Sequence, residues 1–172
     1  LVDFDSDGDQ DLLTCAGDGS VVVFRRQRDG EFATGETLKK PDGLPIIGVR
    51  NGSACAADWD EDGDIDLILP GGRREIRLLR NRQNGQQSAF GEPEPFNVDG
   101  EPILARYGNP APLVADWDGD GRLDVLMGNS DGSVVWYRNA GAADDTVLEE
   151  GRVDCLGNRP RRTDRLNTIA RN

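Results

Sequence analysis

The chain contains no histidine, one methionine and only three cysteines among its 172 residues. Histidine is the commonest general base and a frequent zinc ligand, so its absence argues against histidine-based catalysis and against a zinc site. The cysteines (Cys15, Cys55 and Cys155) are odd in number and form no Cys-x-x-Cys pair. Because Cys15 and Cys55 fall in apolar runs, buried free thiols are favoured, and a disulfide between two of the three cysteines is the alternative.

Long apolar runs and clustered basic residues are also missing. No run is long enough to cross a membrane, and no signal peptide is visible. The chain begins at Leu1 without a methionine and already inside a repeat, so we expect its natural N-terminus to lie further upstream. No basic stripe with interleaved aromatic residues supports nucleic-acid binding. The 22 glycines and 9 prolines favour many turns and an all-β domain.

A nine-residue pattern of aspartates occurs three times, at residues 3–11 (loop 1), 58–66 (loop 2) and 116–124 (loop 3). Each copy has Asp at positions 1, 3, 5 and 9, Gly at position 6 and an aromatic residue at position 2. The copies start 55 and 58 residues apart, a period typical of propeller blades. The loops hold 15 of the 32 acidic residues, and the other 17 stand against 20 basic residues in the chain, so the net charge of −12 comes from the loops.

Carboxylates at alternate positions before a glycine turn can converge on one hard divalent cation, and calcium suits such a site because it accepts many oxygen ligands. Positions 1, 3 and 5 would supply side-chain oxygens, position 7 its backbone carbonyl and position 9 a closing carboxylate. Glycine at position 6 would permit the sharp turn because a Cβ would block it. We predict one calcium ion per loop, three in all. The predicted ligands are Asp3, Asp5, Asp7, Asp9, Asp11, Asp58, Asp60, Asp62, Asp64, Asp66, Asp116, Asp118, Asp120, Arg122 and Asp124.

Two other interpretations of the pattern are weaker. A solvated acidic turn is the simplest, because Asp and Gly both favour turns, but three copies in the same register argue against it. An EF-hand needs a bidentate Glu at position 12 and flanking helices. Position 12 is Thr14, Leu69 or Met127, and the runs that follow each loop are short and apolar, as in strands.

The sequence Asp-x-Asp-x-Asp-Gly-x-x-Asp, followed by an aliphatic run, a Gly-rich turn and a second strand, resembles the FG-GAP/VCBS repeat. This repeat is the blade unit of calcium-binding β-propellers, including the integrin α-subunit head and many bacterial surface proteins. The resemblance covers residues 1 to 140 and implies an all-β fold of three four-stranded blades. A closed propeller has four to eight blades, so we expect the rest of the propeller to come from a longer chain or from sister chains.

We expect residues 1–150 to form the three blades, and residues 151–172 to form an irregular Arg-rich tail or the start of a further blade. In each blade one strand precedes the loop, a second follows it, a third follows a Gly-rich turn, and a weaker outer strand closes the sheet. The expected strands are 1–2, 12–15, 21–25 and 32–38; then 53–57, 65–69, 76–80 and 89–92; then 111–115, 123–127, 134–138 and 146–149.

The resemblance places the segments that cross between blades on the face opposite the calcium loops, which is often the ligand face. Arg and Tyr are common interface anchors, and the candidate ligand residues are Arg50, Arg73, Arg74, Arg106 and Tyr107. Trp59 and Trp117 have the chemistry to stack on carbohydrate, but their fixed place at loop position 2 favours packing between blades.

Three functions fit these observations. The first is a calcium-stabilised recognition or adhesion module, extracellular, on the cell surface or periplasmic, that binds a glycan or protein and is not catalytic itself. The second is the propeller portion of a polysaccharide lyase or hydrolase. The chain has no histidine and no G-x-S-x-G elbow, and its paired carboxylates are assigned to metal, so we expect no catalytic residue in it. The third is a structural assembly module.

Overall fold

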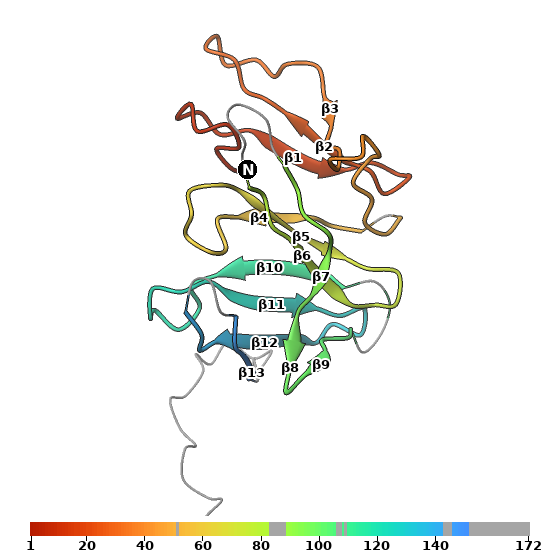
Figure 1. The fold of residues 1–172 in the computed structure, drawn as a ribbon, viewed down its shortest axis with the longest axis vertical. Coiled ribbons are helices and arrows are strands. Elements are labelled where there is room, and N and C mark those ends of the chain that lie inside the picture. The colour runs from red at the N-terminus through yellow and green to blue at the C-terminus, as the bar shows by residue number, and fades with distance from the viewer. Residues whose placement is uncertain (51, 83–88, 106–107, 109, 143–145, 152–172) are drawn as a thin grey trace, which may run out of the picture.

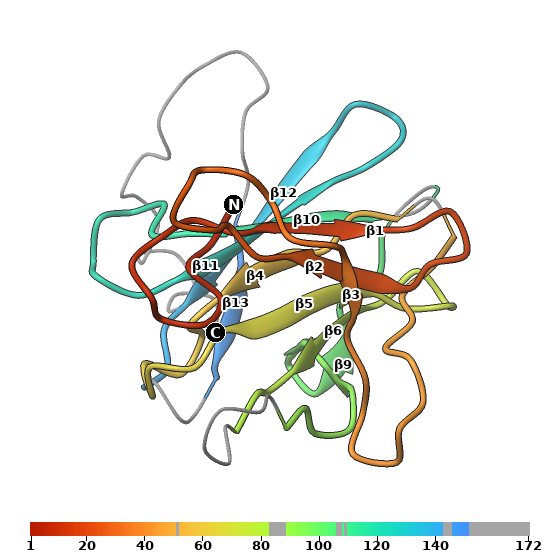
Figure 2. The same ribbon diagram turned by 90° about the horizontal axis from the view of Figure 1, so that it is seen from above.

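The structure is a computed structural model that describes residues 1–50, 52–82, 89–105, 108, 110–142 and 146–151. Within these ranges it contains strands, bridges and turns but no helix, and so no helix able to cross a membrane. Three antiparallel sheets follow one another along the longest axis of the molecule (Figure 1). Figure 2 views the stack from above, where strands of successive sheets cross at an angle.

Each sheet is a meander in which consecutive strands are neighbours. Blade 1 contains β1 (Leu12–Cys15), β2 (Val21–Phe24) and β3 (Glu36–Thr37). Blade 2 contains β4 (Cys55–Ala57), β5 (Asp66–Pro70), β6 (Ile76–Leu79) and β7 (Glu94–Pro95). Blade 3 contains β10 (Ala111–Ala115), β11 (Asp124–Gly128), β12 (Val134–Asn139) and β13 (Leu148–Glu150). A separate hairpin of β8 (Asn97–Val98) and β9 (Glu101–Pro102) lies between blades 2 and 3 in the chain.

The predicted all-β class and the blade units are confirmed, with shifts at the outer edges. The inner strand of blade 1 is a single antiparallel bridge between Val2 and Asp11. The outer strand expected at 89–92 is present only as an isolated antiparallel bridge between Phe90 and Asn81, and the paired strand, β7, lies further along the chain. Phe90 is 1% exposed, and the amide of Gly91 binds the carbonyl of Arg80 at 2.9 Å. The outer strand of blade 2 therefore starts with a bridge at Phe90 and continues as β7.

The hydrophobic core lies between blades. One cluster joins blades 1 and 2 and contains Phe4, Val21, Val23, Leu38, Ile46, Leu67, Leu69, Leu79 and Phe90. A second joins blades 2 and 3 and includes Trp59, Ile68, Phe96, Val125, Met127 and Tyr137. The strands that follow loops 2 and 3, β5 and β11, are buried along almost their whole length. A blade covered on both faces needs apolar residues at successive positions, which explains the poor alternation of these runs.

The aromatic residue at loop position 2 packs against the next blade. Phe4 stacks with Phe90 at a centroid distance of 6.5 Å. Trp59 is 3% exposed, meets the edge of Phe96 at 4.9 Å and donates from Nε1 to Thr146 Oγ1 at 2.9 Å. Trp117 belongs to blade 3, the last described blade, and is 42% exposed. The position-2 aromatics are therefore packing residues wherever a following blade is described.

Trp59 and Trp117 form a matched pair for testing this packing. We expect Trp59→Ala to lower the free energy of unfolding by about 3–5 kcal/mol, the range for truncating a buried aromatic residue. Trp117→Ala should cost about 1 kcal/mol or less, because its ring is half exposed. Urea unfolding of both variants with calcium present measures the difference. Equal losses would contradict packing between blades as the role of position 2.

Candidate calcium loops

Each loop folds around its own position-1 carboxylate. The amides of Asp7 and Gly8 donate to the two carboxylate oxygens of Asp3 at 3.1 and 3.0 Å. Loop 2 repeats this pair on Asp58 at the same distances, and Asp116 accepts three amides in loop 3. In all three loops the position-5 carboxylate accepts the amide of position 7. The chain direction therefore reverses around a set of acidic side chains.

The glycine at position 6 is required by its backbone conformation. Gly8, Gly63 and Gly121 have φ values of 94°, 93° and 93°. The sequence-based reason for glycine was wrong in one respect, because a Cβ at any of the three would meet no atom within 4 Å. The constraint is the left-handed φ, which L-residues with a side chain rarely adopt.

The position-9 carboxylate is buried and joins distant segments. Asp66, which is 0% exposed, accepts the amide of Trp59 at 3.1 Å and that of Asn81, just after β6, at 2.7 Å. The other two blades have equivalent hydrogen bonds. Asp11 accepts the amides of Phe4 and Arg26, and Asp124 accepts the amides of Trp117 and Asn139. In loop 3, Asp124 Oδ2 also accepts a hydrogen bond from Trp136 Nε1 at 3.0 Å. The carboxylate oxygens of Asp11 and Asp66 each keep a second lone pair. Position 9 thus holds the loop to the third strand whatever else it binds.

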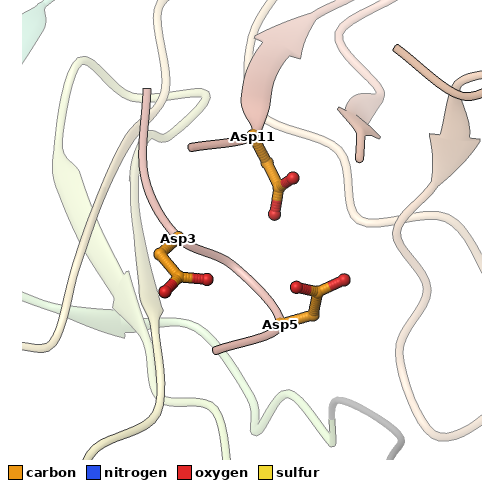
Figure 3. A group of neighbouring side chains, drawn as sticks. All are labelled: Asp3, Asp5 and Asp11. Carbon is orange, nitrogen blue, oxygen red and sulfur yellow. The ribbon is translucent and has the colours of Figure 1, made fainter. Parts of the chain in front are cut away.

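Three carboxylates in each loop bring one oxygen apiece to within 4.8 Å of one another. In loop 1 they are Asp3, Asp5 and Asp11, whose carboxylates face a common space (Figure 3). In loops 2 and 3 they are positions 1, 3 and 5. The structure therefore gathers the predicted ligands of positions 1 and 3 in every loop. The position-7 side chains of Asp9, Asp64 and Arg122 are not members of these clusters, which fits a contribution through the backbone carbonyl.

One oxygen of loop 2 shows that the residues suit a cation. Asp60 Oδ2 is 2.6 Å from Arg80 Nη1, while Asp60 Oδ1 is buried without a hydrogen-bond partner among the described residues. Leaving a buried carboxylate oxygen unpaired is costly. A cation held by Asp58, Asp60 and Asp62 would satisfy this oxygen, and an all-oxygen anionic donor set is the chemistry that calcium prefers.

The pKa values of two loop aspartates also indicate that positive charge would stabilise the loops. Burial raises the pKa of Asp66 to about 6, against the lowering effect of its two amide donors. Burial, followed by the nearby charges of Asp11 and Asp7, raises the pKa of Asp5. These carboxylates are therefore held in their charged form at a cost, which a bound cation would offset.

An arginine at the end of the third strand of each blade pairs with a carboxylate of the loop, and the sequence-based ligand set omitted it. Arg25 Nε lies 3.2 Å from Asp5, Arg80 Nη1 lies 2.6 Å from Asp60, and Arg138 Nε lies 2.6 Å from Asp118. Each partner is the position-3 carboxylate. A signal was present in the sequence, because each arginine follows the first residue of its loop by 22 positions.

The candidate ligand residues belong to the opposite end of the blades. Arg73 and Arg74 are exposed in the turn between β5 and β6, and Arg50 is exposed in the crossing after blade 1. That crossing lies beside the first β-turn of blade 1, because the amide of Gly48 binds the carbonyl of Gly19 at 3.0 Å. Figure 1 shows the three acidic loops together on the other side of the stack. Arg106 and Tyr107 lie outside the described residues.

The cysteines carry no reactive site among the described residues. Cys15 and Cys55 are free thiols and half buried rather than fully buried as expected. Burial raises the pKa of both thiols, which makes them poor nucleophiles at neutral pH. Cys155 and the rest of the predicted tail after Gly151 lie outside the described residues.

The stacked antiparallel meanders, the repeated loops and the cores between blades define a β-propeller-type repeat protein. The profile of the FG-GAP-like repeat family matches residues 3–69 and 58–127, which together span residues 3–127 of the 172. The chain belongs to this family. Searches of curated proteins and of solved structures returned no match.

The two roles of the loop aspartates can be separated by mutation without calcium. We expect Asp11→Ala to lower the free energy of unfolding by about 3 kcal/mol in EGTA, because two amides lose a charged acceptor. Asp9→Ala, at position 7 of the same loop, should change it by about 0.5 kcal/mol or less. Urea unfolding in EGTA tests both variants. An Asp11→Ala variant as stable as the parent would show that its hydrogen bonds are not structural.

Proposed function

We propose that this chain is a calcium-stabilised recognition module of the β-propeller type, which binds a glycan or a protein and is not catalytic itself. One calcium ion would be held in each of the three loops. The carboxylates of positions 1, 3, 5 and 9 and the carbonyl of position 7 would hold it. The ion would supply positive charge to a crowded acidic turn and join the start of the second strand to the end of the first.

The observation that carries the calcium proposal is the unpaired, buried Oδ1 of Asp60 within a cluster of three carboxylates. Clusters of three carboxylates in loops 1 and 3 support it, with position 9 in place of position 5 in loop 1. The proposal also rests on membership of the FG-GAP-like repeat family, whose blades it resembles in loop and strand order. Calcium is abundant outside cells, so we propose an extracellular, cell-surface or periplasmic location.

Ligand recognition is assigned to the end of the blades opposite the loops. Arg50, Arg73 and Arg74 are exposed there on turns and crossings, where side chains can change without disturbing the sheets. Arginine can pair with carboxylates of a protein or an acidic glycan. Arg106 and Tyr107 remain part of the proposal from the sequence alone.

Two alternative functions have less support than this proposal. In a polysaccharide lyase or hydrolase, this chain would be the supporting propeller, because the carboxylate clusters it presents are those assigned to calcium. A structural assembly module is favoured by one observation: Leu113 and Trp117 of blade 3 are 54% and 42% exposed. Apolar residues of this kind suit a further blade, supplied by a longer chain or by a sister chain.

Calcium should raise the thermal stability of the chain. At a calcium concentration one hundred times the dissociation constant, each site adds about 2.7 kcal/mol. We expect the unfolding midpoint to rise with calcium relative to EGTA, and to rise less in the double variant Asp60→Ala, Asp118→Ala. Differential scanning calorimetry measures both.

Magnesium at equal ionic strength is the control, because its strict octahedral geometry suits these loops poorly. A folded protein with the same midpoint in calcium and in EGTA would contradict the proposal.

A further inference from the structure

Each loop pairs with one arginine from the third strand of its own blade. The loops differ in how many of their carboxylates bind a guanidinium group. In blade 1 the guanidinium of Arg25 is divided between Asp5 and Glu36, which lies on β3 outside the loop. In blade 2 Arg80 pairs with Asp60 and leaves the second oxygen of that carboxylate without a partner among the described residues. Loops 1 and 2 therefore keep carboxylate oxygens that no side-chain cation satisfies.

Loop 3 has a second arginine in its own sequence. Arg122 replaces the aspartate found at position 7 of the other loops, and its guanidinium pairs with Asp120 Oδ2. Its Nε donates to the carbonyl of Asn139 at 2.9 Å, which fixes the side chain across the loop. Arg138 contacts two cluster members at once, Asp118 and Asp120, both at 2.6 Å. Two of the three clustered carboxylates thus already bind guanidinium groups.

The formal charge also sets loop 3 apart from loops 1 and 2. Loop 1 has five carboxylates, loop 2 has six, and loop 3 has four and one arginine. With the third-strand arginine of each blade included, the charges are −4, −5 and −2. The charge of the ligands is one of the properties that tune calcium affinity in oxygen-lined loops.

We infer that Arg122 and Arg138 act as resident cations that make loop 3 the weakest of the three calcium sites. Calcium entering loop 3 has to displace or share guanidinium groups on two cluster members, Asp118 and Asp120, whereas only one cluster member of loop 1 and one of loop 2 binds a guanidinium group. The two arginines then keep loop 3 folded at calcium concentrations too low to fill it, while loops 1 and 2 bind calcium at those concentrations. The inference rests on the proposed calcium binding and adds an order among the loops.

Calorimetric calcium titration of the folded chain tests this order, with folding checked by far-UV circular dichroism. We expect two tighter sites and one weaker site, separated by about tenfold or more in dissociation constant. Arg122→Asp restores the residue of loops 1 and 2 at position 7 and should tighten the weak site about tenfold. Arg138→Met should tighten the same site. Arg77→Met is the charge-matched control, because Arg77 pairs with Glu75 away from the loops and should leave all three sites unchanged.

A reciprocal variant in loop 2 tests the same inference if a loop 3 variant folds poorly. Asp64→Arg transfers the arginine to loop 2, where the carbonyl of Asn81 is the counterpart of Asn139, and should convert one tight site to a weak one. Three sites of equal affinity in the parent, or a weak site that Arg122→Asp and Arg138→Met fail to tighten, would overturn the inference and leave the proposed calcium binding standing. A further loss of affinity in Arg138→Met would show instead that the arginine orients a ligand. A parent that binds no calcium at all would refute the proposed function as well.

Discussion

A buried aspartate with both oxygens bound to backbone amides is the interaction on which each blade depends. Asp11, Asp66 and Asp124 occupy the same place in three blades and each accept two amides from separate segments. Hydrogen bonds to a charged group contribute about 1.5–3 kcal/mol each, and losing the acceptor leaves buried donors unpaired. The loop start, the second strand and the end of the third strand are therefore held in one arrangement by a single side chain.

This interaction couples the acidic loops to the cores between blades. The amide that Asp66 binds belongs to Trp59, and the indole of the same residue packs against Phe96 and binds Thr146. Fixing the backbone at loop position 2 aims the ring at the neighbouring blade. A cation that tightens loop 2 would therefore also tighten the stack, because the loop and the aromatic contact share one residue. In loop 1, Asp11 binds the amide of Phe4 in the same way, and Phe4 stacks on Phe90.

Much of this arrangement could be predicted from the sequence because it repeats. The loop period, the glycine at position 6 and the apolar runs after each loop predicted the strand order, and the strand boundaries were close for β1, β2 and β10. The outer strands were predicted less exactly, because they are short and polar. Those of blades 1 and 3, β3 and β13, overlap the expected ranges, whereas in blade 2 the expected range holds only the bridge of Phe90 to Asn81. The arginines were missed because a charged residue at a strand end usually faces solvent, and only the fold brings Arg25, Arg80 and Arg138 to the loops. Ligand identity is not encoded in a pattern this general.

Amide hydrogen exchange with calcium and with EGTA tests the central claim that acidic loops on a fixed backbone frame are completed by calcium. The amides of Trp59 and Asn81, bound by buried Asp66, should be protected under both conditions. The amides of Asp62 and Gly63, which bind Asp58 at the loop surface, should exchange about tenfold more slowly or better with calcium, since a bound ion closes local opening of the loop. Equal rates at Asp62 and Gly63 in calcium and EGTA would contradict the account, because the loops would then be complete without an ion.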